Sequence, residues 1–170
     1  VSEFGWQNRG AGVTYTMLPV YDILLRQQQV EFSDIVRKST YSFEIQNNKT
    51  IFYGKLSSKF NGGFASIRTR ERVQLNGCEK INLKVIGDGN TYQIRIKDSS
   101  YNYYSYAQEF KTTGLEEEIS LSLSKFKPVY RGTSLSKNNF DKRLINELSF
   151  MIVSKKEPNF KLQISEISIN

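Results

Sequence analysis

Tyrosine and arginine are the residues of this chain whose types and spacing suit binding chemistry. Residues 101–106 contain four tyrosines, and tyrosine gives a large contact area at a small cost in side-chain entropy. Arg68 and Arg95 each follow an apolar residue in a segment of alternating polarity. Guanidinium groups beside tyrosine rings suit sugars, carboxylates or a protein surface. The alternative is that the arginines pair with acidic residues of neighbouring strands while the tyrosines complete the margin of the core.

The composition excludes several kinds of catalytic and metal site. The 170 residues include no histidine and one cysteine, Cys78, which excludes a Ser-His-Asp triad, a His-ligated zinc and an internal disulfide. The candidate cation ligands are Asp88, Asp98 and Asp141, whereas calcium normally takes several converging carboxylates or carbonyls. The acidic residues are scattered, without the paired carboxyls that glycosidase chemistry needs. We therefore predict that the protein is not an enzyme and holds no metal or cofactor.

Short β-branched and aromatic segments separated by turn residues dominate the chain from residue 41 onward. In residues 92–97 and 119–123, polar side chains take every second position, which is typical of an antiparallel sheet with one solvated face. Strands spaced by roughly 8–12 residues indicate a β-sandwich or a barrel. The expected strands are residues 41–45, 51–56, 64–69, 80–86, 91–97, 104–110, 118–123, 148–153 and 161–169.

The first forty residues have a different pattern. After Pro19, the side chains of Val20, Ile23 and Leu24 fall on one helical stripe, which predicts a short helix over residues 20–30. We expect residues 1–40 to be an N-terminal extension packed on or beside a single domain of residues 41–170.

Two glycine-containing segments are candidates for turns and for ligand contacts. Asn61 precedes Gly62 and Gly63, which suit a tight connection, or else a loop whose backbone amides approach a ligand. Residues 87–90 read Gly-Asp-Gly-Asn and predict a hairpin turn, with an oxygen-rich cation site as the less favoured alternative.

Positive charge is concentrated in one part of the sequence. The chain carries a formal charge of +7 and has a pI of 9.4, and residues 37–72 contain eight basic against two acidic residues. Such a surface attracts phosphates, acidic lipid headgroups or an acidic protein, although an ordinary solvated surface is the alternative. Bases could stack on the tyrosines, but no nucleic-acid-binding motif is present, so nucleic acid is the least favoured partner.

Five motifs follow one another between Ser42 and Ile169. They are F-x-G-x-L-S from Phe52, N-G-G-F-A-S-x-R from Asn61, G-D-G-x-x-Y-x-x-R from Gly87, F-x-P-x-x-R-G from Phe126 and F-x-L-x-I-x-x-I from Phe160. In this order the chain resembles the family of complex I intermediate-associated protein 30. It departs from that family before the first motif, where neither the Trp6 segment nor residues 34–39 reproduce the usual W-x-x-x-x-D-x-V-M-G-G-x-S element.

The resemblance implies a galactose-binding-like jelly roll, an antiparallel β-sandwich similar to carbohydrate-binding modules. It also implies an assembly factor, because eukaryotic members of the family help to build the membrane arm of respiratory complex I in mitochondria. We therefore expect a non-enzymatic, chaperone-like domain that binds protein subunits of a membrane-associated complex, during assembly or as an accessory subunit. The alternative is a sugar-binding domain similar to carbohydrate-binding modules.

The expected binding residues come from the motifs and from the tyrosine-rich segment. They are Asn61, Arg68, Tyr92, Arg95, Tyr104, Tyr106 and Arg131. Arg131 has a structural alternative, in which a buried guanidinium anchors a loop across one end of the sandwich. The basic composition and the single thiol fit an organelle matrix, with a bacterial cytoplasm as the alternative. The resemblance implies the matrix side of the mitochondrial inner membrane.

Overall fold

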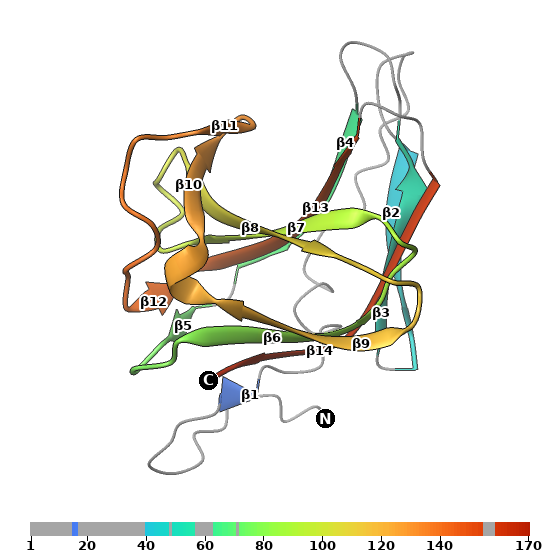
Figure 1. Ribbon diagram of the computed structural model, residues 1–170, viewed down its shortest axis with the longest axis horizontal. Coiled ribbons are helices and arrows are strands. Elements are labelled where there is room, and N and C mark those ends of the chain that lie inside the picture. The colour runs from blue at the N-terminus through green and yellow to red at the C-terminus, as the bar shows by residue number, and fades with distance from the viewer. Residues whose placement is uncertain (1–14, 17–39, 48, 57–62, 71, 155–158) are drawn as a thin grey trace.

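Alternating apolar and polar side chains place most strands of this chain in two antiparallel sheets that pack face to face (Figure 1). The computed structural model describes residues 15–16, 40–47, 49–56, 63–70, 72–154 and 159–170. In spatial order, sheet A consists of β2 (Thr40–Gln46), β3 (Lys49–Lys55), β14 (Asn159–Ile169), β6 (Lys80–Ile86) and β9 (Glu116–Ser122), and β1 (Tyr15–Thr16) also pairs with β14. Sheet B consists of β11 (Thr133–Ser134), β10 (Lys127–Tyr130), β8 (Ser105–Lys111), β7 (Thr91–Lys97), β13 (Glu147–Ser154) and β4 (Gly63–Thr69).

The all-β prediction is confirmed. All nine expected strands form, and their ends differ from the expected ends by at most two residues. The structure adds β5 (Val73–Gln74), which pairs with β12 (Leu144–Ile145), the short strands β10 and β11 at one end of sheet B, and a short 3₁₀ turn over Leu123–Lys125. The predicted helix over residues 20–30 lies outside the described residues.

The core lies between the two sheets because every second residue of each strand points inward. On β7, Tyr92, Ile94 and Ile96 are fully buried, and the residues between them face solvent to varying degrees. Phe52 of sheet A and Phe150 of sheet B are also buried in this layer. The polar side chains are thereby left on the outward face of each sheet.

Residues 87–90 cross from one sheet to the other, and do not form the hairpin turn that the sequence predicts. The flanking strands, β6 and β7, belong to sheets A and B respectively. The Thr112 hydroxyl lies beneath the segment, where it accepts hydrogen bonds from the amides of Asp88 (3.2 Å) and Gly89 (3.1 Å) and donates one to the carbonyl of Asn90 (2.9 Å). A carboxylate oxygen of Asp88 accepts hydrogen bonds from the Tyr92 hydroxyl at 3.0 Å and from the Lys161 amide at 2.7 Å. This polar cluster ties the crossing to the start of β14, and it gives the G-D-G-x-x-Y motif a structural role.

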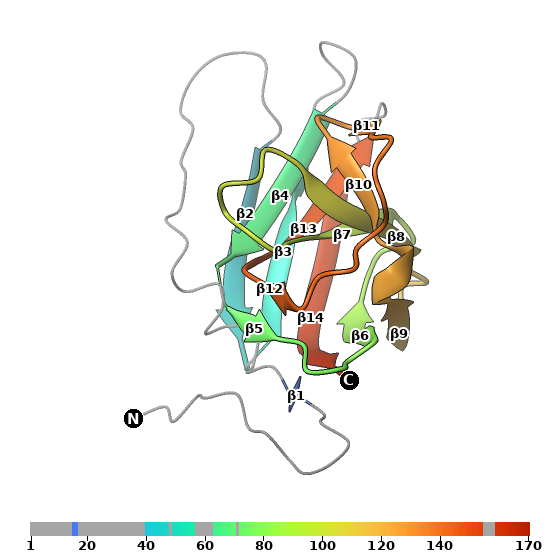
Figure 2. The ribbon, with the colours of Figure 1, turned by 90° about the vertical axis from the view of Figure 1, so that its left-hand side faces the viewer.

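Sheet B is curved, with its outward face on the inside of the bend. In Figure 1, β10 and β11 rise at one end of this sheet while β13 and β4 rise at the other, and β8 and β7 form the floor between them. The second view shows the two sheets as successive layers (Figure 2). In the part of the chain that the structure describes, no helix has the length and apolarity needed to span a membrane.

Candidate functional site

Three basic residues form one row across the outward face of sheet B. The strand register aligns Arg68 of β4 with Ser149 of β13, and Ser149 with Arg95 of β7. It also aligns Arg95 with Ala107 of β8, and Ala107 with Lys127 of β10. We call Arg68, Arg95 and Lys127 the basic row. The residues between them, Ser149 and Ala107, have short side chains, so the three long cationic side chains extend further from the sheet than the residues that separate them.

Arg95 is the central and least exposed cation of the basic row. Its Nε and Nη2 atoms donate to Oε1 of Gln93 at 3.1 and 2.7 Å. Burial lowers the pKa of Arg95, but an arginine keeps its charge in proteins because its pKa starts so high. Arg95 forms no ion pair with any residue that the structure describes. Its guanidinium is therefore oriented by a neutral amide and can still bind an anionic group.

Gln93 connects Arg95 to the carboxylate of Glu109. The Nε2 atom of Gln93 donates to Oε1 of Glu109 at 3.0 Å, while its oxygen accepts from Arg95. The amide thus stands between the guanidinium and the carboxylate. This arrangement keeps Glu109 from pairing directly with Arg95.

Next to the basic row, a second line of outward-facing residues on sheet B contains an acidic residue as well as basic ones. Glu147 of β13 lies opposite Lys97 of β7, and its carboxylate is 3.6 Å from Nε of Arg70. The Lys97 ammonium donates to the backbone oxygen of Asn102 at 3.0 Å. Arg70 and Lys97 therefore already have acceptors within the protein, unlike the Nη1 group of Arg95, for which no partner is found among the described residues.

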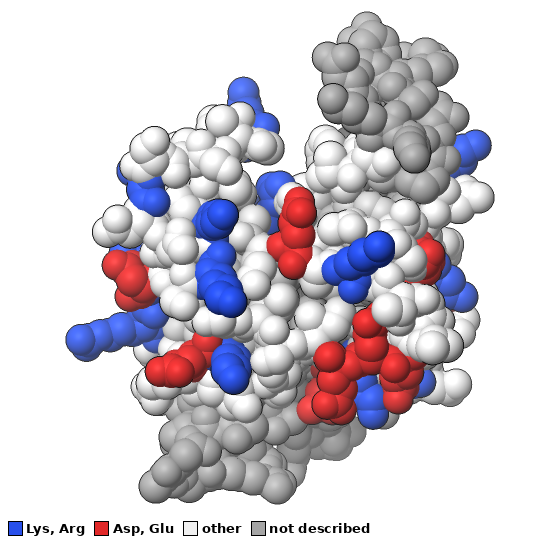
Figure 3. Space-filling view, viewed as in Figure 1, with Lys and Arg blue, Asp and Glu red and all other residues white. Residues whose placement is uncertain are grey.

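An apolar pair lies at the β4 end of the same face. Phe64 and Val153 are cross-strand neighbours, and 60% and 55% of their surfaces are exposed. Figure 3 shows the surface hollowed at the top of the view, above the floor of sheet B. The outward face of sheet B therefore combines a concave basic floor with an apolar rim.

The sequence leaves open whether the tyrosines share this face with the arginines or complete the margin of the core, and for Tyr92 and Tyr106 the structure shows the second. Tyr92 and Tyr106 point inward and are buried in the core, with 0% and 3% of their surfaces exposed. Tyr106 packs edge-on against Phe140, with ring centroids 5.2 Å apart. Tyr104 is half-buried between Tyr103 and Tyr106, and the Lys137 ammonium lies 5.4 Å from its ring. These rings form a stack that leads from the core to one end of the sandwich.

Arg131 is exposed at the tip of the β10–β11 hairpin and does not anchor a loop from within. It and Gly132 form the two-residue connection between Tyr130 and Thr133, with φ values of +47° and +82°. Two positive φ values define a type I′ turn, in which a non-glycine residue at the first position is strained. The guanidinium carbon lies 5.2 Å from the centre of the Tyr130 ring.

Replacing Arg131 with glycine is expected to raise the free energy of unfolding by about 0.5–1 kcal/mol, because glycine adopts a positive φ without a steric penalty. Urea unfolding of Arg131→Gly and of the wild type measures the difference. The matched control is Arg131→Lys, which keeps both the charge and the Cβ atom and should unfold like the wild type. A glycine variant no more stable than the lysine variant would contradict the strained turn.

The remaining predicted features are distributed over the molecule. Asn61 lies outside the described residues. The basic stretch of residues 37–72 is divided, with Lys49 and Lys55 on β3 of sheet A and Arg68 and Arg70 at β4 of sheet B. Sequence reasoning missed Lys127, because its strand was not predicted. It also missed Gln93, although Gln93 is two positions from Arg95 on the same strand and therefore points to the same side of the sheet.

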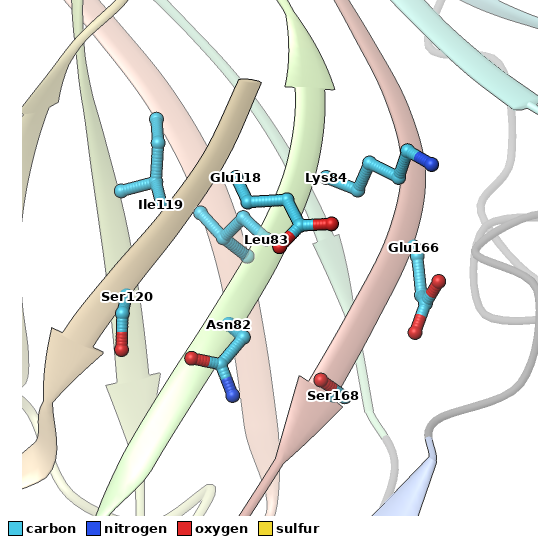
Figure 4. Close-up of a pocket in the computed structure, with 8 residues that line it drawn as sticks. All are labelled: Asn82, Leu83, Lys84, Glu118, Ile119, Ser120, Glu166 and Ser168. Atoms are coloured by element: carbon cyan, nitrogen blue, oxygen red, sulfur yellow. The ribbon is translucent and has the colours of Figure 1, made fainter. Parts of the chain in front are cut away.

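A second hollow, of about 360 Å³, lies on the outward face of sheet A (Figure 4). Glu118 of β9 and Glu166 of β14 lie on the two sides of Lys84 of β6, and the Lys84 ammonium is 3.5 Å from Glu116. Acidic residues gather over β9 at the lower right of Figure 3. Glu118 and Glu166 are both exposed, so this site lacks the buried acid that general acid–base catalysis commonly uses.

The candidate cation ligands belong to separate parts of the described structure. Asp88 bonds to the Tyr92 hydroxyl and to backbone amides, Asp98 accepts from the Asn102 amide at 2.8 Å, and Asp141 pairs with Lys142. In the described ranges, no three cysteine or acidic side chains are placed to hold a metal ion.

Comparison with known proteins identifies both a family and a fold. The family model for complex I intermediate-associated protein 30 matches residues 34–164. The fold is similar to the family 11 carbohydrate-binding module from Clostridium thermocellum in complex with a β-1,3-1,4-mixed-linked tetrasaccharide. The identity is 13% and the TM-score 0.59, and 82% of this chain and 91% of that chain are covered.

A second solved structure is the family 11 module of the cellulosomal cellulase Lic26A-Cel5E, also from Clostridium thermocellum. It has 13% identity and a TM-score of 0.57, with 84% of this chain and 92% of that chain covered. A search of curated protein sequences gives no significant match. At these identities the structures establish the fold alone, a jelly roll of the galactose-binding-like kind.

Proposed function

The chain belongs to the family of complex I intermediate-associated protein 30, and from this membership we propose that it is a non-enzymatic interaction domain. It binds protein subunits of a membrane-associated complex of the respiratory complex I type, either during assembly or as a permanent accessory subunit. Its partner docks on the outward face of sheet B. The family match over residues 34–164 supports the class of function, and the geometry of sheet B supports the choice of face.

The observation that carries the choice of face is the state of Arg95. Arg95 is a half-buried guanidinium held by a neutral amide and without an ion-pair partner in the described structure, so an acidic group of a binding partner can pair with it. Aligned cations on both sides and an apolar rim at Phe64 and Val153 provide the mixture of polar and apolar contacts found in transient interfaces. No such combination is present at the sheet A hollow, whose lysine already has a carboxylate partner.

The proposed location is the matrix side of the mitochondrial inner membrane. The net charge of +7 supports it, because a basic domain is attracted to the negatively charged surfaces of membranes and of acidic subunits. Cell fractionation of the endogenous protein, with and without a salt wash of the membranes, tests this location. Recovery only in a cytosolic fraction would exclude it.

Removing the two arginines of the basic row is expected to reduce recovery of the native partner about tenfold or more, since truncating one member of a desolvated charge pair costs several kcal/mol. The measurement is crosslinking and co-purification of the tagged full-length chain from its native cells, comparing the wild type with the double variant Arg68→Ala/Arg95→Ala. The matched control is Lys55→Ala/Lys161→Ala, which removes the same charge from exposed positions on sheet A. A wild-type protein that runs only as a free monomer would overturn the proposed function.

Sugar binding is the second candidate, and one observation favours it. Arg95, Gln93 and Glu109 form a hydrogen-bonded chain on a concave sheet, and side chains of these types bond sugar hydroxyls. Against it, Tyr92 and Tyr106 are buried and offer no ring to a sugar. A glycan array with Gln93→Ala as the control variant tests this candidate, and absence of wild-type binding removes it.

A further inference from the structure

We infer that the segment of the partner that docks on sheet B is an extended acidic peptide whose carboxylates are spaced to match the basic row. This inference rests on the proposed function and adds the chemistry of the partner. It follows from the spacing of the three cations, the hydrogen bonds of Arg95 and the side chains that line the floor of the face.

The strand order sets the spacing of the cations. One strand, β13, separates Arg68 from Arg95, and one strand, β8, separates Arg95 from Lys127. Neighbouring strands are about 4.8 Å apart, so the backbone positions of successive cations are about 10 Å apart. A polyproline II segment rises about 3.1 Å per residue with three residues per turn, which places every third side chain on one side, about 9–10 Å apart. An acidic residue at every third position therefore puts one carboxylate opposite each cation.

Gln93 keeps the central cation available to such a peptide. Its amide oxygen holds two donor nitrogens of Arg95, so the guanidinium is fixed in orientation without losing its charge to an internal carboxylate. The Nη1 group is left to donate to a peptide carboxylate in a charge-assisted hydrogen bond. Gln93 is thus a positioning residue for the proposed contact.

The floor of the face fits a peptide better than an acidic polysaccharide. Ser149 and Ala107 fill the positions between the cations, and neither offers an aromatic platform on which a sugar ring stacks. The exposed aromatic ring of Phe64 lies at the rim, next to Val153, where it can pack against an apolar side chain that flanks the acidic positions. Charge, spacing and apolar contact all favour a protein segment.

The test uses the purified full-length chain and two fluorescent synthetic peptides of equal length and composition. In one peptide every third residue is glutamate, and serine and proline fill the positions between the glutamates. In the other peptide the same glutamates are contiguous. Fluorescence anisotropy at low ionic strength measures the dissociation constants, because exposed charge contacts are screened by salt. The spaced peptide should bind several-fold more tightly than the contiguous peptide.

The decisive variant is Gln93→Glu, which preserves the size of the side chain. A carboxylate at this position would lie within hydrogen-bonding distance of Arg95, pair with it and compete with the peptide, so binding should weaken about tenfold. Glu109→Gln should instead tighten binding, because it removes a negative charge beside the row. Lys55→Gln, on sheet A, changes net charge without touching the row and should have little effect.

Equal binding of both peptides, or equal binding by the wild type and Gln93→Glu, would overturn the inference. Tighter binding of polygalacturonate than of the spaced peptide would overturn it in favour of an acidic polysaccharide. These outcomes are separable from the proposed function, because the co-purification assay does not use the peptides. Recovery of a native partner together with failure of the peptides would refute the acidic segment alone, whereas failure to recover any partner would refute the proposed function.

Discussion

Replacing Gly87 with alanine should lower the free energy of unfolding by about 3 kcal/mol, since it combines overpacking with disruption of a buried hydrogen-bond cluster. A Cβ atom built on Gly87 would lie 2.2 Å from both Cβ and Oγ1 of Thr112. Thr112 is 1% exposed, and its hydroxyl bonds three backbone groups of residues 88–90. The threonine cannot rotate away without breaking those bonds, so the crossing between the sheets would have to shift.

The matched control for this prediction is Gly89→Ala in the same segment. Gly89 has a φ of +85°, but a Cβ atom there meets nothing within 4 Å, so its substitution adds backbone strain of only about 1 kcal/mol. Chemical denaturation of both variants and the wild type gives the two differences. If Gly87→Ala unfolds at the same denaturant concentration as Gly89→Ala, close packing against Thr112 is not what fixes the crossing.

The strands could be predicted from the sequence because alternation is a local property. In residues 92–97 the apolar positions repeat with period two, and β7 forms there with the expected bounds. The connection between β6 and β7 was predicted wrongly, because its type depends on which strands pair. Residues 87–90 read Gly-Asp-Gly-Asn, a sequence typical of turns. Such a turn can join two adjacent strands of one sheet or cross from one sheet to the other, and the sequence of the turn does not distinguish the two. The pairing of the strands is decided by packing across the whole domain.

Strand parity also determines which binding residues could be found from the sequence. Arg95 and Gln93 are two positions apart and share a face, whereas Tyr92 is three positions from Arg95 and must face the other way. The burial of Tyr92 was therefore readable from strand parity, although the prediction grouped residues by type. Lys127 gave no comparable signal, because it joins the basic row only through the pairing of β10 with β8. β10 is a four-residue strand that contains Pro128, and proline cannot donate a hydrogen bond to a neighbouring strand.

Burial of Tyr92 also links the stability of the fold to alkaline pH. Its hydroxyl donates to Asp88 at 3.0 Å, and burial, followed by the charge and the hydrogen bond of Asp88, raises the pKa of Tyr92 well above its ordinary value. The folded protein therefore retains the phenolic proton at a pH where the unfolded chain loses it. This contribution to stability is fully present below about pH 10, the ordinary pKa of tyrosine, and is lost as the pH rises above it.

Between pH 8 and pH 11 the wild type should accordingly lose about 1.4 kcal/mol of unfolding free energy through Tyr92. Tyr92→Phe should be less stable than the wild type at pH 8, because it lacks the hydrogen bond to Asp88, but this gap should narrow by about the same 1.4 kcal/mol at pH 11. Burial and the bond to Tyr104 also raise the pKa of Tyr106, so both proteins will retain some alkaline sensitivity. Guanidinium denaturation at the two pH values measures the gap, with Tyr101→Phe, at a 96% exposed position, as the control. A gap that stays constant with pH would mean that Tyr92 ionises as readily in the folded protein as in the unfolded chain.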